Sequence, residues 1–310
     1  MSWVKKVHVI APAFPLVGDL QIQDFQKGLK VLEKWGYQPV VPEKLFGPDL
    51  LCANSDKMRF QHLKKALQSS TADLIWCVRG GYGSMRLLPL LAQMEKPEKP
   101  KRIVGISDVT SLHSFMNNVW GWKSLHLPLI DRLGSGVLST ENEQEIFDYL
   151  QGRLSHIEYP LVAMNAAAKK KGTISATLVG GNLTVLTASL GTPYLPYPKK
   201  KKYFLFLEDL GERGYRVDRM LQQWIHSGAL HQCQGILLGE FLGGHEPLTS
   251  QNPEVFLAMP VLQRFADEIS IPVFGGVPAG HGKTQRPVIF GDKILITAGK
   301  APKVRFSGDK

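Results

Sequence analysis

The stretch Ala72-Asp-Leu-Ile-Trp-Cys-Val-Arg-Gly-Gly-Tyr-Gly83 decides the fold class, because a short apolar run ends directly in a glycine-rich turn. Such a run is typical of a buried strand, and the glycines leave a bare backbone after it. The stretch Arg102-Ile-Val-Gly-Ile-Ser-Asp108 has the same form, with a serine where the apolar run stops. The two stretches predict neighbouring strands whose carboxyl ends carry loops that could bind a ligand.

Strand and helix signals alternate on either side of these two stretches, and this order favours a parallel sheet with helices on both faces. Ser55 is the candidate N-cap of one of the helices, and Gly36 is a plausible end for another. The predicted strands are 7–11, 38–41, 74–78, 102–106 and a run near Leu125, and the predicted helices are 21–35, 56–68, 87–91 and a segment through Leu112 and Phe115.

The remainder of the chain predicts a second α/β domain that is richer in strands. Its predicted strands are 173–178, 203–207, 235–239 and 273–274, with short β runs in 287–307, and its predicted helices are 217–225 and 254–268. The stretch between the two domains changes in composition, which favours a connection. We therefore predict an N-terminal α/β domain over 1–134, an interdomain linker over 135–172 and a C-terminal domain over 173–310.

Composition excludes several classes of protein. The chain has 310 residues, of which 44% are hydrophobic and 21% charged, an ordinary globular balance that disfavours disorder, collagen and coiled coil. Lys and Arg number 37 against 27 Asp and Glu, a formal charge of +10. The lysine runs 169–171 and 199–202 are not interleaved with aromatic residues, so we expect solvated turns and no nucleic-acid partner.

Cysteine usage and the apolar runs bear on the location of the protein. Cys52, Cys77 and Cys233 are widely spaced and form no CxxC pair, which predicts core thiols in a reducing compartment. No apolar run approaches about 18 residues, so no membrane span is expected. The first residues enter a strand pattern without the apolar core of a secretory signal, and we therefore expect a cytoplasmic protein.

Three short segments could carry chemistry, and each also has an ordinary structural interpretation. Ser107 stands between a strand and a helix, where it is either an exposed nucleophile or a simple N-cap. Glu208 follows the apolar run 203–207, as a carboxylate serving a site or as an acid in a charged turn. His281 lies between Gly280 and Gly282, as a base with an open approach or as a surface histidine.

Taken together, Ser107, Glu208 and His281 supply a nucleophile, a carboxylate and a base. A serine hydroxyl is a weak nucleophile near neutral pH and needs an imidazole to take its proton, and the imidazole needs a carboxylate to fix its tautomer. Ser107 falls in the first predicted domain and the other two in the second. We therefore expect the site in the cleft between the domains.

Other motifs are weaker. The run Gly282-Lys-Thr284 lacks the P-loop glycine, since position 277 is Val. The turn Arg79–Gly83 could supply a backbone N–H to an oxyanion or be only a tight turn. No H-E-x-x-H or similar cluster occurs, so no metal and no cofactor are expected.

The segments Arg79-Gly-Gly-Tyr-Gly83, Gly105-Ile-Ser-Asp108, Gly180-Gly-Asn-Leu183, Leu207-Glu-Asp-Leu-Gly-Glu212 and Gly280-His-Gly282 follow one another in an order that resembles the LD-carboxypeptidase family of serine peptidases. That family includes muramoyltetrapeptide carboxypeptidases and microcin C immunity peptidases. The resemblance extends from Val9-Ile-Ala-Pro12 to the His281 loop. Ala279 departs from it, since many relatives are expected to carry a bulkier residue there.

The resemblance implies an N-terminal domain similar to class I glutamine amidotransferases, a β-rich C-terminal α/β domain and a homodimer. It implies Ser107 as nucleophile, Glu208 as its carboxylate and His281 as base, with an oxyanion hole from the backbone N–H groups of Asp108 and Gly81. The implied reaction releases the terminal D-alanine from murein tetrapeptide, free or nucleotide-linked, during cell-wall peptide recycling.

A carboxypeptidase must also hold a free substrate carboxylate, for which Arg79 is a candidate unless it is a structural ion-pair partner. One alternative is a microcin C immunity-type peptidase that cleaves a peptidyl or aminoacyl nucleotide with the same triad. An alternative of another class is a non-catalytic protein that binds anionic murein peptides on this scaffold.

Overall fold

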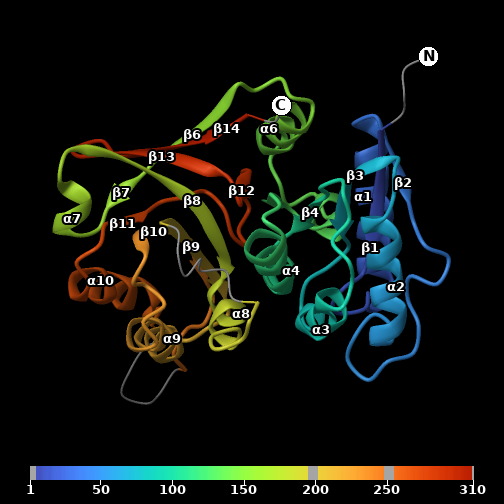
Figure 1. The fold of residues 1–310 in the computed structure, drawn as a ribbon, viewed down its shortest axis with the longest axis horizontal. Coiled ribbons are helices and arrows are strands. Elements are labelled where there is room, and N and C mark those ends of the chain that lie inside the picture. The colour runs from blue at the N-terminus through green and yellow to red at the C-terminus, as the bar shows by residue number, and fades with distance from the viewer. Residues whose placement is uncertain (1–4, 195–201, 248–254, 309–310) are drawn as a thin grey trace.

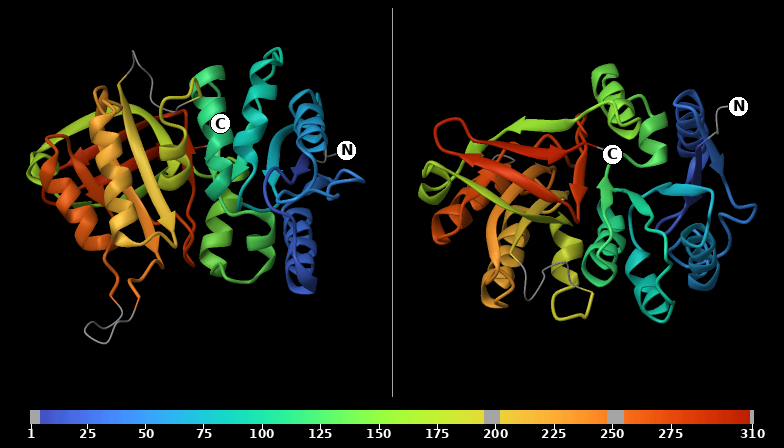
Figure 2. Two further views of the ribbon diagram at one scale, coloured as in Figure 1. Left: turned by 90° about the horizontal axis from the view of Figure 1, so that it is seen from below. Right: turned by 45° about the horizontal axis from the view of Figure 1, so that its top comes forward.

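The computed structural model describes residues 5–194, 202–247 and 255–308, and it contains two sheets that lie side by side with helices around each (Figure 1). Most of the lysine run 199–202 lies outside the described residues. Both sheets mix with helices along the chain, which confirms the predicted α/β class. Figure 2 shows helices around both sheets, including green helices that lie between the two.

The first sheet has six strands in the order β12-β5-β4-β3-β1-β2. The first five strands of the chain run parallel to one another, as predicted, and β12 pairs antiparallel with β5 at one edge. Their bounds are β1 Lys5–Ile10, β2 Tyr37–Val40, β3 Ala72–Cys77, β4 Arg102–Gly105, β5 Ser124–His126 and β12 Val288–Phe290.

Side chains alternate between the two faces of this sheet. Trp76 belongs to the core packed by α1 (Gly18–Lys34), whereas its neighbours Ile75 and Cys77 belong to the core packed by α2 (Asp56–Leu67), α3 (Leu88–Ala92) and α4 (Thr110–Phe115). Successive side chains of a strand point to opposite faces, so a run that is apolar throughout requires cover on both. The predicted helices on both faces are therefore confirmed.

Local signals set several helix boundaries. The Ser55 hydroxyl accepts the N–H of Met58 and caps α2, as predicted. Pro89 lies in the first turn of α3, where its missing N–H costs nothing. A short helix η1 (Ser84–Leu87) precedes α3, and η2 (Ser107–Val109) precedes α4.

The second sheet has eight strands in the order β6-β14-β13-β8-β9-β10-β11-β7, with four parallel strands at its centre. The stretch 135–172, predicted as a linker, contains α6 (Thr140–Leu150) and α7 (Ala166–Lys169) and also contributes two strands to this sheet. The bounds are β6 His156–Pro160, β7 Val162–Ala163, β8 Gly172–Asn182, β9 Tyr203–Leu210, β10 Cys233–Leu242, β11 Val273–Gly275, β13 Lys293–Ala298 and β14 Lys303–Ser307.

Helices α8 (Leu183–Ala188), α9 (Gly214–His226) and α10 (Ala258–Glu268) cover one face of the second sheet around a core that includes Trp224. Cys52, Cys77 and Cys233 are free and buried, so the prediction of core thiols is confirmed. Strand β12 belongs to the C-terminal part of the chain but pairs with β5 in the first sheet. The C-terminal part of the chain therefore contributes strands to both sheets.

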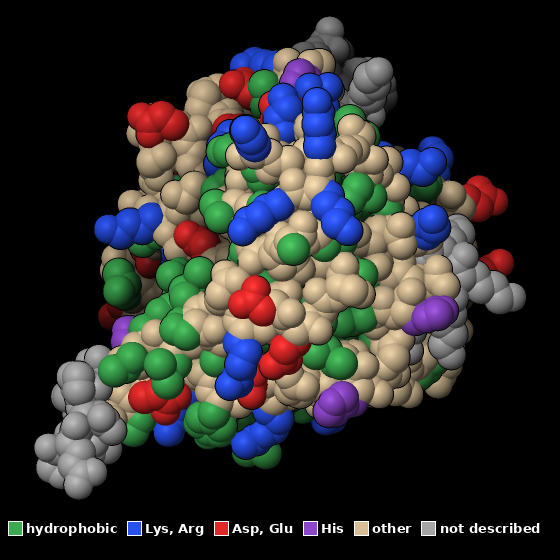
Figure 3. Space-filling model, turned by 90° about the vertical axis from the view of Figure 1, so that its left-hand side faces the viewer, with side chains coloured by type: hydrophobic (Ala, Val, Ile, Leu, Met, Phe, Trp, Pro, Cys, Tyr) green, Lys and Arg blue, Asp and Glu red, His purple; other side chains and the backbone are tan. Residues whose placement is uncertain are grey.

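Basic side chains gather at one end of the face that holds α7 and α10 (Figure 3). Lys169, Lys170, Lys171 and Lys300 are exposed, in line with the solvated turn predicted for 169–171. Among the helices of the described residues, none has both the length and the apolar character needed to cross a membrane.

Candidate active site

Ser107 occupies a strained position at the carboxyl end of β4. Its φ is 64°, and it is the sole non-glycine residue with positive φ in the described parts of the chain. A non-glycine residue in this region costs free energy and is often found at functional sites. The cap position of η2 belongs to Ile106, so the N-cap interpretation of Ser107 is wrong.

The glycine turn after β3 lies directly against this serine. A Cβ added to Gly80 would lie 2.8 Å from the Ser107 Cβ and 2.9 Å from its Oγ, so glycine at 80 keeps the hydroxyl accessible. The neighbouring Gly81 has a φ of 110° and packs against the ring of Phe14. The turn and the serine therefore form one side of the site.

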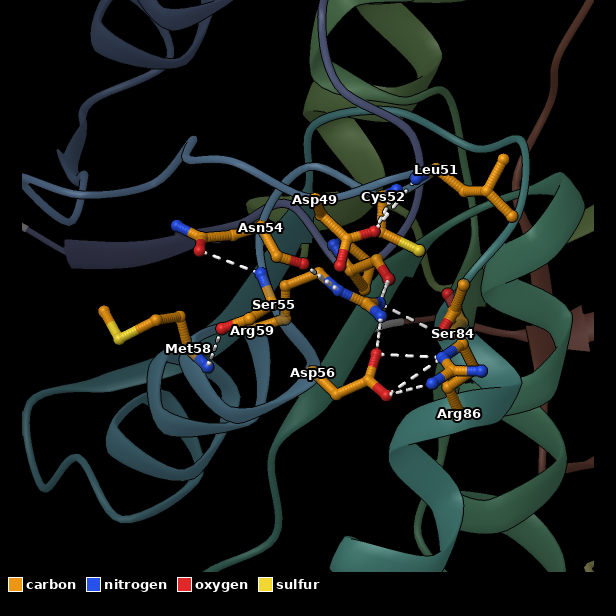
Figure 4. A network of polar contacts seen from close by, with 12 residues as sticks. Asp49, Leu51, Cys52, Asn54, Ser55, Asp56, Met58, Arg59, Ser84 and Arg86 are labelled. Carbon is orange, nitrogen blue, oxygen red and sulfur yellow. Dashed lines mark hydrogen bonds and ion pairs between the residues drawn. The ribbon is translucent and has the colours of Figure 1, made fainter.

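A network of polar contacts holds the far end of that turn (Figure 4). The Arg59 side chain is fully buried; its Nη1 donates to the carbonyl oxygens of Pro12 and Gly83, and its Nη2 pairs with Asp56. The Asp108 carboxylate accepts the N–H of Ser84 at 2.7 Å. Burial raises the pKa of Asp108 against the opposing effect of that bond. The residue after the serine is thereby tied to the glycine turn.

Glu208 and His281 meet on the other side of the site. The Nδ1 of His281 lies 2.6 Å from Glu208 Oε2, and the Glu208 side chain is fully buried while 13% of His281 is exposed. Glu208 lies inside β9 rather than just beyond a strand, because β9 continues to Leu210. The predicted contact between the carboxylate and the imidazole is present, and His281 is not a surface-loop histidine.

The loop that carries His281 is held by an arginine and a glutamate that are distant from each other in sequence. Arg132, on α5 (Ile130–Gly134), donates from Nη2 to the carbonyl oxygens of His281 and Gly282 at 2.6 and 2.7 Å. The N–H of Gly282 donates to Glu240 Oε2 at 2.7 Å. A Cβ on Gly282 would lie 2.3 Å from the Glu240 carboxylate, so this close approach requires glycine. The backbone of His281 is thus fixed by one cation and one anion.

The charges of the Glu208–His281 pair stabilise one another. Burial opposes ionisation of Glu208, but the charge of His281, the polar contact with His126 and the hydrogen bond from His281 together outweigh it and hold the pKa of Glu208 at about 2. Burial lowers the pKa of His281, and the Glu208 charge and hydrogen bond more than reverse this, so the pKa lies above its usual 6.5. Such an imidazole can take a proton and keep it as a stabilised imidazolium.

The segment that follows Ser107 contacts the second sheet next to Glu208. Thr110, three residues after Ser107, accepts the N–H of Asn182 through its Oγ1 at 2.9 Å, and Asn182 is the register partner of Glu208 in β8–β9. The Ser107 side chain makes no hydrogen bond with His281, although the structure describes both residues. Catalytic hydrogen bonds are often long in unliganded structures and shorten when substrate binds.

Arg79 forms a structural ion pair and still keeps part of its side chain exposed, so the structure leaves room for both roles considered from the sequence. Its Nη1 forms an ion pair with Asp131 at 2.9 Å, and about a third of its side chain remains exposed. Burial raises the pKa of Asp131, and the neighbouring Arg79 opposes that effect. Arg79 begins the glycine turn, so this pair anchors the turn to α5.

Sequence reasoning missed four residues that shape the site, namely Arg59, His126, Arg132 and Glu240. Glu240 carried a usable signal, because it lies near the carboxyl end of a strand beside β9, as Glu208 does. The other three residues act through contacts between segments that are distant in sequence, and no local sequence pattern predicts such contacts. Within the described residues, no group of three or more His, Cys, Asp or Glu side chains could hold a metal ion.

Two family profiles match the chain. Residues 7–127 match the LD-carboxypeptidase N-terminal domain, and residues 175–296 match the LD-carboxypeptidase C-terminal domain. Ser107 lies in the first match, and Glu208 and His281 lie in the second. The two matches together span well over half of the chain.

Individual relatives extend over most of the chain. A protein of Rickettsia conorii, whose name describes it provisionally as a carboxypeptidase and gives no substrate, is 34% identical over 81% of this chain and 76% of its own. The murein tetrapeptide carboxypeptidase of Pseudomonas aeruginosa is 28% identical over 94% and 92%. The microcin C7 self-immunity protein of Escherichia coli is 24% identical over 88% and 85%.

A solved structure supports the same grouping. The muramoyltetrapeptide carboxypeptidase from Oxalobacter formigenes superposes with a TM-score of 0.80 at 25% identity, covering 98% of this chain and 99% of the other. The resemblance to a known fold therefore includes both sheets.

Proposed function

Because the chain belongs to the LD-carboxypeptidase family, we propose that it is a serine carboxypeptidase that releases the terminal D-alanine from murein tetrapeptide. The observation that carries the proposal is the 2.6 Å contact between His281 and buried Glu208, on the same sheet boundary as the strained Ser107. Family membership supports a carboxypeptidase, and the serine mechanism and the L,D bond are the parts that we propose.

In the proposed reaction, the hydroxyl oxygen of Ser107 attacks the carbonyl carbon between the L-centre and the D-alanine. Nε2 of His281 takes the hydroxyl proton and then gives it to the departing D-alanine nitrogen as the C–N bond breaks. Water attacks the acyl-serine next, with His281 taking the water proton and returning a proton to Ser107. Glu208 stays ionised throughout, because its pKa is about 2.

The oxyanion of the tetrahedral intermediate needs preorganised donors. We propose the backbone N–H groups of Asp108 and Gly81 for this role, since the glycine turn packs against Ser107. The Asp108–Ser84 bond and the Arg59 contact with Gly83 support the geometry of that turn. These two contacts therefore hold the backbone segments that carry the proposed oxyanion donors, and neither of them engages the Ser107 hydroxyl.

The free carboxylate of D-alanine needs a cation. We propose Arg79, because part of its side chain stays exposed at the start of the glycine turn while Asp131 fixes its position. Arg132 is a poorer choice, since its Nη2 already serves the carbonyls of His281 and Gly282. A guanidinium can pair with a carboxylate through its other nitrogens while one is engaged.

Similarity to the microcin C7 self-immunity protein supports a second candidate substrate, an aminoacyl or peptidyl nucleotide cleaved by the same triad. Purified protein should be offered three substrates: free tetrapeptide, UDP-linked tetrapeptide and an aminoacyl sulfamoyl adenosine. We expect D-alanine release from one or both peptides, and none from a tetrapeptide ending in L-alanine. Cleavage of the nucleotide alone would overturn the murein assignment.

We further propose a cytoplasmic homodimer that acts in recycling of cell-wall peptides. The proposal rests on the family resemblance, and two relatives are named for carboxypeptidase action on murein peptides. Analytical ultracentrifugation and cell fractionation test the two parts separately. A monomer at micromolar concentration contradicts the first part, and recovery outside the cytoplasm contradicts the second.

A further inference from the structure

His126 lies at the centre of the boundary between the two sheets. It is the last residue of β5 and pairs in register with Gly105 of β4, two residues before Ser107. Its side chain is 2% exposed, and its Nε2 lies 3.9 Å from Oε1 of Glu208. The carboxylate of Glu208 therefore lies between two imidazoles, His281 on Oε2 and His126 on the side of Oε1.

The two facing atoms are both without a partner. Neither His126 Nε2 nor Glu208 Oε1 has a hydrogen bond among the residues that the structure describes. A buried carboxylate oxygen without a donor is costly, and so is a buried ring nitrogen without a partner. A relative movement of about 1 Å would bring the two atoms within hydrogen-bond distance and satisfy both.

The surroundings of His126 hold its ring in place. The rings of Phe206 on β9 and Phe290 on β12 pack edge-on against it, at centroid distances of 5.3 and 5.6 Å. His113 of α4 packs on the same Phe290 ring, and burial lowers the pKa of His113 to about 3, so it stays neutral. These rings thus hold the His126 imidazole with its Nε2 edge toward the carboxylate of Glu208.

We propose that His126 is a positioning residue, whose Nε2–H donates to Oε1 of Glu208 after this small movement, with or without substrate, and thereby keeps Oε2 on His281. The catalytic consequence rests on the proposed function. Because His126 comes from the sheet that carries Ser107, the bond also aligns the nucleophile in one domain with the carboxylate and base in the other.

Removing this donor has a definite electrostatic consequence. A carboxylate with one donor fewer keeps more of its negative charge for its remaining partner, which stabilises the imidazolium of His281. Loss of His126 should therefore raise the pKa of His281. A residue that served only to fill space would not have this effect.

The test is the NMR titration of His281 in the wild type, His126→Phe and His126→Gln. Phe keeps a ring between Phe206 and Phe290 without a donor, and Gln restores a donor at similar reach. We expect Phe to raise the pKa of His281 by about half a unit to one unit and Gln to return it toward the wild-type value. This titration needs no substrate, so it stays informative even if D-alanine release fails.

Kinetics supply the second readout. His126→Phe should lower kcat about tenfold to 100-fold, with KM within about twofold, and His126→Gln should recover most of the loss. Phe290→Leu is the matched control, because it loosens the same ring contacts and leaves the donor in place. The control should lower Tm without changing the pKa of His281.

Three outcomes overturn the inference. The first is an unchanged His281 pKa and kcat in a folded His126→Phe protein, and the second is Gln behaving like Phe. If the Phe variant does not fold, His126→Asn takes its place, because its shorter amide cannot reach Glu208. An Asn variant with a wild-type His281 titration is the third contradicting outcome.

Discussion

The imidazole Nδ1 of His281 and the carboxylate Oε2 of Glu208 lie 2.6 Å apart, although 73 residues separate them in sequence. The pair joins a loop after β11 to the middle of the second sheet, and the carboxylate is fully buried. This contact occupies Nδ1, so Nε2 is the ring nitrogen that we propose takes the proton of Ser107.

Glu208→Gln keeps the shape of the side chain and removes its charge. We expect kcat/KM to fall about 10³-fold, because the imidazolium loses its anion. In the wild type, activity rises as His281 loses its proton, and its raised pKa puts that rise above pH 6.5. In the variant, the residual activity should rise at lower pH. The pH profile of kcat/KM measures both effects.

The matched control is Glu268→Gln, which neutralises an exposed glutamate of α10. It should leave the magnitude and the pH profile of kcat/KM unchanged. A Glu208→Gln enzyme whose profile rises at the wild-type pH would show that Glu208 does not set the pKa of His281.

Arg59→Lys tests the support of the glycine turn. A single ammonium group cannot replace the four contacts of the guanidinium, which reach the carbonyl oxygens of Asn54, Pro12 and Gly83 and the carboxylate of Asp56. We expect the free energy of unfolding to fall by about 2–4 kcal/mol, since buried acceptors are left unpaired. Urea unfolding measures this loss.

Arg86→Lys is the control for Arg59→Lys, because Arg86 pairs with the same Asp56 from an exposed position. Its loss should be below about 1 kcal/mol. Equal losses in the two variants would count against a special role of the buried guanidinium.

Gly81→Ala tests the geometry proposed for the oxyanion turn. The φ of 110° disfavours alanine, and the new Cβ would lie 2.2 Å from a ring atom of Phe14. Gly18→Ala has a φ of 73° and open space, so it carries only the backbone cost of about 1 kcal/mol. Gly81→Ala should lose more stability than Gly18→Ala and should also lower kcat; equal losses of stability and unchanged kcat would contradict the geometry.

Asp209 gives stability a pH dependence. Burial, followed by the Glu208 charge, raises the pKa of Asp209 from 3.8 to about 6. A raised carboxyl pKa favours the folded state at low pH, and this contribution is lost as pH rises from about 4 through 6. The loss corresponds to about 3 kcal/mol. Asp209→Asn should remove it, so urea unfolding of the two proteins should differ in its change between pH 4.5 and 7.

The Asp209 contacts limit what asparagine can replace. One carboxylate oxygen accepts the N–H and hydroxyl of Thr184, and the other accepts the side-chain amide of Asn182 and the N–H of Leu210. Asparagine keeps an acceptor for Thr184 and loses the second acceptor, so it lowers stability at every pH and only the change with pH is compared. A wild-type protein whose stability follows the same pH course as Asp209→Asn would rule out this titration.

Much of the fold could be predicted from local patterns. The apolar run 74–78 is covered on both faces, and Ser55 caps α2, because strand burial and capping depend on residues close in sequence. Strand β12 falls in the predicted β runs of 287–307, but the sheet that it joins could not be foreseen. Its three residues carry no signal of which sheet they join, and the pairing with β5 depends on the whole path of the chain.

In the candidate site, too, some features depend on local sequence and others on contacts between distant segments. The contact of Glu208 with His281 was predictable, because the residue types demand each other chemically and each stands by a strand. The position of Glu208 within β9 was not, since the apolar run 203–207 ends just before it. His126 and Arg132 escaped notice because each acts on the other domain, at a distance in sequence that no motif spans.

The most direct measurement of the central claim is D-alanine released from murein tetrapeptide by the wild type and by Ser107→Ala. Alanine removes the nucleophile and makes no new contact with the glycine turn. The account predicts release by the wild type and a loss of at least about 10³-fold in kcat for a folded variant. Release by Ser107→Ala at a rate near that of the wild type would contradict a serine mechanism.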